Sequence, residues 1–511
     1  MSSLVVAETI AEFYTGKCIF ITGATGFMGK VLIEKLLRSC GGIDKIYVLM
    51  RTKKGMNVHE RLNKITDLVL FDKLRETNPN FAKKLIPIEG DVTHIDLGLG
   101  PEDRKVLQDN VSIIFHAAAS VRFDDPLKDA IILNTRGTRE VIRLASEIKK
   151  LSAFVHVSTT YCNTDRKVVE EVLYPPHADW RKAIDIAEKM DHYTLQVMLS
   201  KYMNKLPNTY TFTKSMAEHV VYDLCKGKLP AVVFRPSIVI SAMKEPMPGW
   251  LDNFNGPVGL LIASGKGILR SNYSDPEIIT DFCPVDVAIK GLVVAAWKKG
   301  TTRKLDEKLD VNFYNCSSHN VTAVTQGEMI AMGKQLNWEV PLSNPLWYPG
   351  GGITKCKYWH YINVLFLHLI PALLIDLVLK IMNKKPMLLK VQRRIFSANM
   401  ALHYFISRQW AFKNDNFINL NKQILPDEKE QFDFGLQNID VWVYFKNAIL
   451  GAKRFLLKES NTNLEQAKVT LYRLYVLHVI VNGIFYAFMF WLVIFKCNLI
   501  SRASGYLNLF S

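Results

Sequence analysis

The chain lacks the cysteine and histidine patterns that mark zinc sites, redox dithiols and disulfide-stapled secreted folds. Its eight cysteines are scattered over 511 residues, and no two of them form a C-x-x-C pair. No group of His, Asp or Glu has the spacing of metal ligands, so we expect no metal. These absences favour a protein of a reducing, cytosol-facing environment.

The chain also has no recognisable export signal and no nucleic-acid motif. Its first residues, MSSLVVAETIAEFYTGK, have neither a basic start nor a long apolar core. Repeats, low-complexity stretches and Arg/Lys-rich runs are absent, so we expect no nucleic acid as a partner. The net charge of +16 instead favours phosphates, coenzyme A or an anionic membrane surface.

A glycine-rich segment, IFITGATGFMGKVLIEKLL at 19–37, predicts a buried strand, a tight turn and a helix. Glycines let backbone N–H groups approach a pyrophosphate at a helix N-terminus. The spacing is T-G-x-x-G-x-x-G, and alone it also occurs in turns that bind no dinucleotide. We assign to the cofactor site the residues of this turn: Thr22, Gly23, Thr25, Gly26, Phe27, Met28 and Gly29.

The rest of the first half alternates apolar runs with helical segments. Further strands are predicted at 45–51, 85–92, 111–125, 153–163 and 230–239. Such alternation predicts an α/β fold, a Rossmann-type doubly wound parallel sheet. Ligands of such sheets bind at the carboxyl ends of the strands, where Asp91, Ala117 and Ala118 fall. Together with the glycine turn, these strand ends predict a dinucleotide site.

The second strand favours NADPH over NADH. It ends at Arg51, followed by Lys53 and Lys54, with no acid in reach. At this point of a dinucleotide fold an acid accepts from the 2′-hydroxyl of NAD, whereas a cation accommodates the 2′-phosphate of NADP. An ordinary solvated basic turn is the alternative.

Chemistry is predicted at Y-T-F-T-K, residues 210–214, which begins a helix. Tyr210 and Lys214 are four residues apart and share a helix face. The ammonium can stabilise a phenolate and bond the nicotinamide ribose, and the phenol then becomes a proton donor near neutral pH. A hydroxyl at the end of the fifth strand can hold the substrate oxygen as charge builds on it. The candidates are Ser158, Thr159 and Thr160.

These motifs together resemble the extended short-chain dehydrogenase/reductases. More narrowly, FITGATGFMGKVLIEKLLRS, FHAAASVRFD, VHVSTTYCN, YTFTKSMAE and VFRPSIV resemble the alcohol-forming fatty acyl-CoA reductases of the insect type. The segment 360–455 resembles that family's own C-terminal domain. The resemblance favours Thr159 over Ser158 as the catalytic hydroxyl, and it places Pro236 and Ser237 at the nicotinamide end of the cofactor.

The resemblance implies an enzyme that uses NADPH to reduce long-chain fatty acyl-CoA to a primary alcohol. Coenzyme A leaves, and the reaction passes through a bound aldehyde. The alternatives are an acyl-CoA reductase that stops at the aldehyde, a membrane-bound steroid or sugar-nucleotide dehydrogenase, and a non-catalytic scaffold. The residues also have plainer interpretations: His116 as a packed strand end, Asp124 and Asp125 as turn residues, and Arg235 as part of a structural turn.

Two apolar segments suggest a membrane. Residues 476–495 carry no formal charge and are long enough to span a bilayer. More basic residues precede this segment than follow it, which keeps the catalytic part on the cytosolic side. We expect the membrane to be an intracellular one, of the endoplasmic reticulum or peroxisome. Residues 361–382 are interrupted by Pro371 and Asp376, so we favour an interfacial helix or an acyl-tunnel wall over a span.

The predicted organisation has four parts. Residues 1–355 form the NADP-binding reductase domain, 356–470 the C-terminal domain, 471–496 a transmembrane helix, and 497–511 a short tail. Homo-oligomerisation is left open, as are acyl length and the membrane used.

Overall fold

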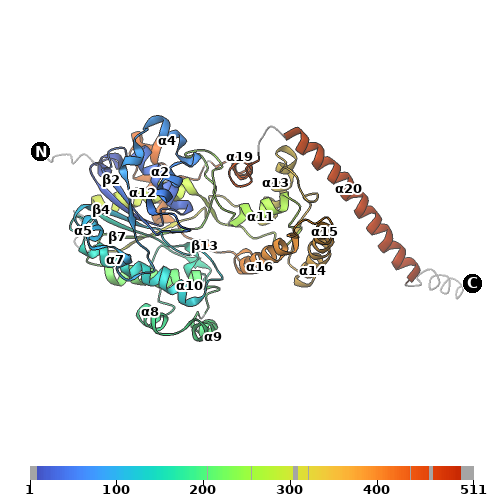
Figure 1. Cartoon of the computed structure of the whole chain (residues 1–511), viewed down its shortest axis with the longest axis horizontal. Coiled ribbons are helices and arrows are strands. Elements are labelled where there is room, and N and C mark those ends of the chain that lie inside the picture. Colours follow the sequence, from blue (N-terminus) through green and yellow to red (C-terminus); the bar gives the residue numbers. More distant parts are fainter. Residues whose placement is uncertain are drawn as a thin grey trace, which may run out of the picture. The chain divides into compact units, whose positions relative to one another are not determined.

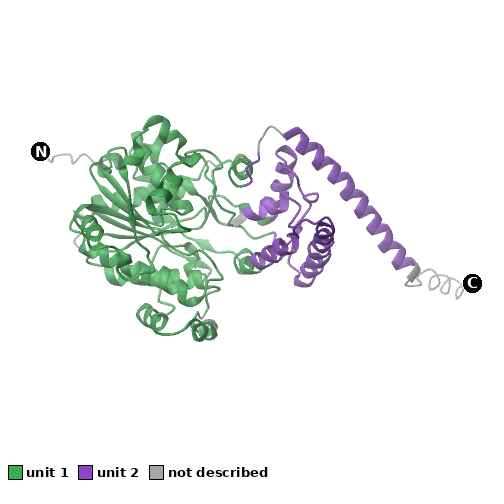
Figure 2. Cartoon of the chain, viewed as in Figure 1, with its two compact units in different colours: residues 1–258, 277–326, 400–456 green, residues 259–276, 327–399, 457–511 purple. Residues whose placement is uncertain are grey.

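The computed structural model describes residues 8–203, 205–254, 256–302, 309–319, 321–437, 439–459 and 464–496. The chain divides into two compact units, each built from three segments (Figure 2). Unit 1 comprises residues 1–258, 277–326 and 400–456, and unit 2 comprises residues 259–276, 327–399 and 457–511. The segment 400–456 therefore folds with the N-terminal half, although it lies in the predicted C-terminal domain.

Unit 1 is built on a seven-stranded sheet whose strands all pair in parallel (Figure 1). The strand order is β11-β7-β5-β4-β1-β2-β3, so the chain reverses direction across the sheet between β1 and β4. Ligands bind at such a switch point. The strands are β1 Cys18–Thr22, β2 Lys45–Met50, β3 Leu85–Glu89, β4 Val111–His116, β5 Ala153–Val157, β7 Ala231–Pro236 and β11 Asn312–Cys316.

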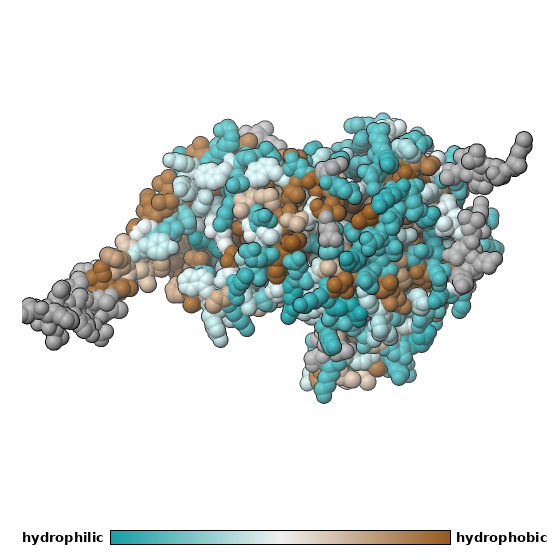
Figure 3. Space-filling view, turned by 180° about the vertical axis from the view of Figure 1, so that it is seen from behind, coloured by the Kyte–Doolittle hydropathy of each residue, from teal (hydrophilic) through white to brown (hydrophobic). Residues whose placement is uncertain are grey.

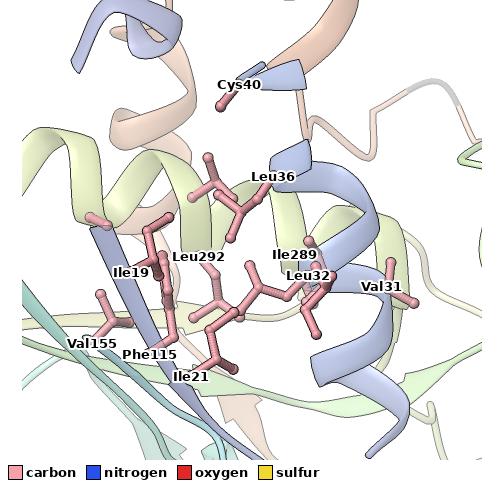
Figure 4. Close-up of a cluster of buried hydrophobic side chains, with 14 of the residues drawn as sticks. Ile19, Ile21, Val31, Leu32, Leu36, Cys40, Phe115, Val155, Ile289 and Leu292 are labelled. Atoms are coloured by element: carbon pink, nitrogen blue, oxygen red, sulfur yellow. The ribbon is translucent and has the colours of Figure 1, made fainter. Parts of the chain in front are cut away.

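Helices cover both faces of this sheet because its strands are apolar on both sides. Ile19 and Ile21 of β1 pack into a core shared with α2 (Phe27–Ser39) and α12 (Val285–Thr302) (Figure 4). Phe20, between them, enters the opposite core with α7 (Gly137–Glu147) and α10 (Thr209–Cys225). This alternation is the period of two expected of a strand.

Shorter elements complete unit 1. Two small parallel pairs join β6 (Val168–Val169) to β13 (Ala411–Phe412) and β8 (Ile238–Ile240) to β10 (Phe282–Pro284). Further helices are α1 Ile10–Tyr14, α3 Val58–Thr66, α4 Asp72–Thr77, α5 Pro101–Asn110, α6 Leu127–Ala130, the π-helical η4 Ile131–Arg136, α8 Trp180–Lys189, α9 His192–Tyr202, α17 Asp415–Lys422, α18 Lys429–Phe432, α19 Val441–Gly451 and the π-helical η8 Ala452–Leu456.

The predicted fold class is confirmed, with corrections to the strand lengths. The third, fourth and fifth predicted strands end at Glu89, His116 and Val157, earlier than expected. The residues that follow leave the sheet because they turn toward the ligand-binding edge. The seventh strand, β11, was not predicted, because its sequence NFYNC has asparagines and only two large apolar residues.

Unit 2 contains two short paired strands and most of the helices of the C-terminal half. The strands are β9 Ser271–Tyr273 and β12 Gly352–Thr354, which pair in parallel. The helices are α11 Gly256–Gly265, α13 Gln326–Glu339, α14 Lys357–Asn363, the π-helical η6 Val364–Leu369, α15 Ile370–Ile381, α16 Leu388–Ile406, α20 Leu464–Trp491 and the π-helical η10 Leu492–Lys496. Of these, α11 and α13 begin in unit 1 and α16 ends there.

Both predicted apolar segments are helices long and apolar enough to cross a membrane. Along α20, hydrophobic residues continue to the last described turn (Figure 3). Lys357–Ile381 is one continuous helix, so neither Pro371 nor Asp376 ends it. A π-helical turn precedes Pro371 and accommodates its ring, and Asp376 finds backbone partners within unit 2. The predicted tail, 497–511, lies outside the described residues.

Candidate active site

The glycine turn of unit 1 has the close backbone packing that a phosphate cradle requires. Gly23 has φ +77°, and a Cβ there would lie 2.6 Å from the backbone of Ala117 and Ala118. A Cβ on Gly29 would lie 2.3 Å from the Gly23 oxygen. Gly26 begins α2 without a side-chain cap, so backbone N–H groups of the first turn face outward for an anion. The residues therefore fit a bound dinucleotide.

The other turn residues have mainly structural contacts. The Phe27 ring stacks on Trp250 with centroids 5.4 Å apart. Phe27 and Met28 both pack against the core around α2. Thr25 is half-buried at the turn. These positions place the three side chains beside the cradle, where they orient the backbone.

A buried histidine connects the turn to the strand end that carries the alanines. His116 Nδ1 lies 2.7 Å from the Thr22 hydroxyl, and Nε2 lies 3.0 Å from the Thr138 hydroxyl. The Thr138 hydroxyl donates to Asn134 O, so we assign the ring proton to Nε2. Burial is the main cause that lowers the pKa of His116 to about 3. The neutral ring therefore has a packing role, and it holds Thr22 where that residue accepts from Ala118 N–H.

Arg51 and Asp91 meet at the ends of neighbouring strands. Arg51 Nη1 donates to Asp91 Oδ2 over 3.1 Å, and the side chains are 57% and 15% exposed. Burial acts to raise the pKa of Asp91, but hydrogen bonds from Thr93 and the Arg51 charge outweigh it and lower that pKa. The expectation that no acid lies in reach of Arg51 is wrong, because the acid comes from β3 rather than from the local sequence.

Tyr210 and Thr159 form the centre of the candidate site. Asn208 caps α10 by accepting from Thr211 N–H at 2.9 Å, so Tyr210 lies in the first turn of the helix. The half-buried phenol lies near the Thr159 hydroxyl, which acts to lower the pKa of Tyr210. Thr159 also accepts from Tyr161 N–H at 3.2 Å, which leaves its own proton available to the phenol oxygen.

The phenol is a proton carrier at neutral pH. Burial raises the pKa of Tyr210, and the Thr159 hydrogen bond only partly opposes this effect. We expected Lys214 to make the phenol more acidic, but the Lys214 ammonium donates to Val157 O at 2.6 Å. Burial lowers the pKa of Lys214 to about 8, while Glu218 acts in the opposite direction.

Ser158 is committed to a different partner. Its hydroxyl donates to the Glu218 carboxylate over 2.5 Å. Glu218 in turn receives two bonds from the buried Arg235 guanidinium, at 2.8 and 2.7 Å. Arg235 also donates to the carbonyls of Glu170 and Val172. The structure therefore brings Thr159, but not the Ser158 hydroxyl, to Tyr210.

The remaining predicted residues lie at the end of β7. Pro236 is the last residue of that strand, and Ser237 N–H donates to Cys316 O at 2.9 Å. These residues line the carboxyl edge of the sheet next to β5. Across the described residues, no group of three or more His, Cys, Asp or Glu lies close enough to hold a metal ion.

Sequence reasoning missed an aromatic wall beside Tyr210. Phe123 stacks on Tyr210 with centroids 6.1 Å apart and contacts Phe405 at 5.1 Å. Tyr161 lies against Phe405 and Trp410 at 5.4 and 5.8 Å. Phe405 and Trp410 come from the segment 400–456, far from Tyr210 in sequence. Glu218 was missed as well, although its place one turn after Lys214 was a usable signal.

The parallel sheet with its switch point, the glycine cradle and the Tyr210–Thr159 pair define the class. The protein is a nicotinamide-nucleotide oxidoreductase with an extended short-chain dehydrogenase/reductase fold. Two family models, both described as male sterility protein, match the chain. The NAD-binding model matches residues 21–292, and a second model matches residues 367–459.

Comparison with known proteins gives the family. The chain is 40% identical to fatty acyl-CoA reductase 1 of Xenopus laevis over 466 residues, which cover 91% of this chain and 90% of that protein. It is 39% identical to the Homo sapiens protein of the same name over the same shares. It is 36% identical to fatty acyl-CoA reductase 2 of Bos taurus, over 93% of this chain and 91% of that one. The chain belongs to the fatty acyl-CoA reductase family.

Solved structures share the fold. The reductase domain of a nonribosomal peptide synthetase from Mycobacterium tuberculosis matches with TM-score 0.57 and 19% identity, over 88% of this chain and 96% of that one. The terminal R domain of the myxalamid biosynthetic pathway matches with TM-score 0.56 and 18% identity, over 86% of this chain and 91% of that one.

We predict that Thr159→Val and Ser158→Ala have opposite consequences. Thr159→Val removes a donor at the reacting oxygen, so kcat should fall by about 10²–10³ with little change in stability. Ser158→Ala leaves a buried carboxylate with one donor fewer, so it should cost about 1–3 kcal/mol of unfolding free energy. Steady-state kinetics and thermal unfolding of both variants test this. Equal losses of kcat in the two variants would contradict the assignment.

The pKa of Lys214 predicts a pH limit on activity. If its ammonium is required, kcat/KM should fall about tenfold per pH unit above about pH 8, where the folded protein loses this proton. The free energy of unfolding changes in the opposite direction. The Lys214 ammonium has a pKa of 10.5 in the unfolded chain and about 8 in the folded one, so the unfolded state binds more protons between these values. The folded state therefore becomes more stable as the pH rises from about 8 to about 10.5. A pH–rate profile checks the limb. Lys214→Arg should move it upward, because the guanidinium stays charged.

Proposed function

We propose that this chain reduces long-chain fatty acyl-CoA to a primary fatty alcohol with NADPH as the reductant, releasing coenzyme A. The proposal is carried by Thr159 and Tyr210, which lie close together after the carboxyl end of β5 and one helical turn from Lys214. It is supported by relatives that are named fatty acyl-CoA reductases and that match over nine-tenths of the chain.

The residues that would hold the cofactor follow the switch point of the sheet. The backbone between Gly23 and Gly29 would cradle the pyrophosphate. Arg51, which is mostly exposed, would turn from Asp91 toward a 2′-phosphate. Ala117 and Ala118 present only small side chains to a cofactor that lies over the strand ends. Lys214 would bond the nicotinamide ribose in addition to Val157 O.

The chain's residues act on the substrate carbonyl. When bound, the cofactor supplies a hydride to the thioester carbon. Thr159 donates a hydrogen bond to the oxygen as negative charge builds on it, and Tyr210 gives that oxygen a proton. The product of this step is a thiohemiacetal. The C–S bond of the thiohemiacetal then breaks and the hydroxyl proton passes to sulfur. The products of this step are free coenzyme A and an aldehyde.

The same residues suffice for a second reduction. After the first round the Tyr210 phenolate would regain a proton from solvent. The aldehyde carbonyl would then take the place of the thioester, receive a hydride from a second NADPH and a proton from Tyr210, and leave as the alcohol. Release of the aldehyde after the first round is the alternative outcome. A steroid or sugar-nucleotide dehydrogenase is disfavoured by the match of residues 367–459 to the family's second domain model.

We also propose that the protein is anchored in an intracellular membrane, of the endoplasmic reticulum or peroxisome, with its catalytic part in the cytosol. Tyr475 and His478 of α20 pack on Trp338 and Tyr348 of unit 2. The part of the helix after residue 478 is available to cross the bilayer. Its described residues, 479–496, span roughly 27 Å as a helix, which is close to the thickness of the hydrocarbon core. Lysines and arginines upstream of α20 favour the cytosolic side.

We propose that the chain has a reductase region and a C-terminal region, and part of the C-terminal region folds with the reductase region. Residues 1–355 form the reductase region and 356–470 the C-terminal region. Within the latter, the segment 400–456 belongs to unit 1 and supplies Phe405 and Trp410 to the aromatic wall. This apolar wall suits the acyl chain of the substrate. A homo-oligomer is not proposed.

Tyr210→Phe tests the chemistry. It removes the proton donor but keeps the ring, so kcat should fall by about 10²–10⁴ while NADPH affinity stays within a few-fold. The measurement is alcohol and aldehyde analysis by gas chromatography with a panel of acyl-CoA substrates. Phe123→Leu, which keeps the phenol but alters the wall, is the matched control and should change KM more than kcat. Normal alcohol output from Tyr210→Phe would overturn the role.

Arg51→Gln tests the cofactor preference. Replacing Arg51 by Asp would place a second carboxylate beside that of Asp91, so glutamine is the cleaner change. Loss of one charge-assisted contact costs about 1.5–3 kcal/mol, so NADPH affinity should fall about 10–150-fold while NADH affinity changes little. Lys83→Gln removes a charge before β3, at the amino ends of the strands and away from Arg51 at their carboxyl ends, and should affect neither affinity. Unchanged NADPH binding by calorimetry would exclude Arg51 from the phosphate site.

A further inference from the structure

The helix Lys357–Ile381 of unit 2 has its polar and apolar faces reversed relative to a soluble protein. Every fourth residue is buried, and none of these five is more than 7% exposed. They are His360, Val364, His368, Ala372 and Asp376. The π-helical turn Val364–Leu369 widens the helix midway and helps this repeat stay on one side. Three of the five buried side chains are polar.

Each polar residue of this buried stripe has a backbone or side-chain partner within unit 2. His360 Nδ1 lies 3.0 Å from the Ser271 hydroxyl of β9. His368 Nε2 accepts from Arg270 N–H at 2.9 Å. Asp376 accepts from the N–H groups of the residues that begin α16, at 2.9–3.0 Å. The beginning, the middle and the last turns of the helix are therefore held to one protein surface.

The rest of the helix surface is apolar and exposed. Only 22% of its most apolar 18-residue window is buried. Large side chains on this face are each at least 45% exposed: Ile362, Phe366, Leu373, Leu374, Leu377 and Ile381. A contiguous apolar face of this size is unfavourable in water, and exposed apolar patches of this kind mark interaction sites.

The fixed contacts exclude a transmembrane orientation. Immediately before the helix, Gly352–Thr354 pairs with Ser271–Tyr273. If the helix crossed a bilayer, His360, His368 and Asp376 would carry β9 and the start of α16 into the hydrocarbon. Irregular backbone that faces lipid is not tolerated there. A helix that lies in the membrane plane keeps all three contacts on the protein side.

Positive charge adjoins the apolar face. Lys380, Lys384 and Lys385 are exposed at the end of the helix, and Arg393 and Arg394 are exposed on α16. Lysine and arginine near a membrane surface attract anionic headgroups by about 1 kcal/mol each. An apolar face flanked by cations fits a lipid surface better than the apolar surface of a second protein copy.

We propose that Lys357–Ile381 is an in-plane membrane helix whose exposed face enters one leaflet of an anionic bilayer. The proposal extends the proposed membrane association but does not depend on α20 for its geometry. Both ends of the helix lie on the same side of the membrane. Such helices insert roughly 5–10 Å below the headgroups.

The test uses the full chain reconstituted in sealed vesicles of phosphatidylcholine and phosphatidylserine. In a Cys356→Ser, Cys497→Ser background, a fluorescent probe is placed by Leu374→Cys, Ile484→Cys or Tyr193→Cys, on α15, α20 and α9. Lipids with quenchers at shallow or deep positions report depth. We expect shallow quenching at 374, deep quenching at 484 and none at the α9 control. Separately, an impermeant maleimide should label Tyr358→Cys and Met382→Cys equally without detergent.

Three results would overturn the inference. Protection of only one end until detergent is added would make the helix a span. A water-exposed probe at residue 374 would show that the apolar face of the helix does not contact lipid. If the emission of this probe changed with protein concentration, a second copy of the chain would be covering the face. Deep quenching at 484 in any of these cases shows that the tail anchor holds, so failure of this inference is separable from failure of the proposed anchoring.

Discussion

The buried ion pair of Arg235 and Glu218 is the interaction on which the arrangement of the site depends. It joins β7 to α10, and through Glu170 O, Val172 O and the Ser158 hydroxyl it also joins the loop after β6 and the end of β5. A pair of this kind gains little net stability over an apolar replacement, but losing one partner costs about 3–5 kcal/mol because a charge is left buried. Its contribution is to fix how α10 lies on the sheet, and with it the position of Tyr210.

The pair also separates the roles of two neighbouring hydroxyls. Successive side chains of an extended segment point to opposite sides, so Ser158 faces Glu218 while Thr159 faces the phenol. Ser158 thereby donates its proton to the Glu218 carboxylate. If Ser158 turned to donate to the substrate oxygen, the buried carboxylate would lose this hydrogen bond. The histidines His116 and His156, adjacent on β4 and β5, are neutral because burial lowers the pKa of each, so they add no charge beside Lys214.

Local pattern was enough to predict the parallel sheet, the glycine turn and the helix that begins near Tyr210. These features depend on residues close together in sequence: apolar runs, glycine spacing and a four-residue repeat. The Arg51–Asp91 contact, the aromatic wall from Phe405 and the partner of Ser158 depend on which strands and segments become neighbours, which no local pattern carries. The Val157 carbonyl that receives the Lys214 ammonium was missed for a related reason, since it lies on a strand far from Lys214 in sequence.

Hydropathy alone left the helix Lys357–Ile381 open between an interfacial helix, a tunnel wall and a span, and the reason is physical. Pro371 and Asp376 count against a membrane helix when it is assumed that all faces meet lipid. Here the acid caps the backbone of α16, and the proline follows a π-helical turn, so neither faces the apolar side. The informative signal is the period of four in His360, His368 and Asp376 within an otherwise apolar segment. A soluble helix turns such residues to water, whereas a helix that turns them to its own protein leaves its apolar face for lipid.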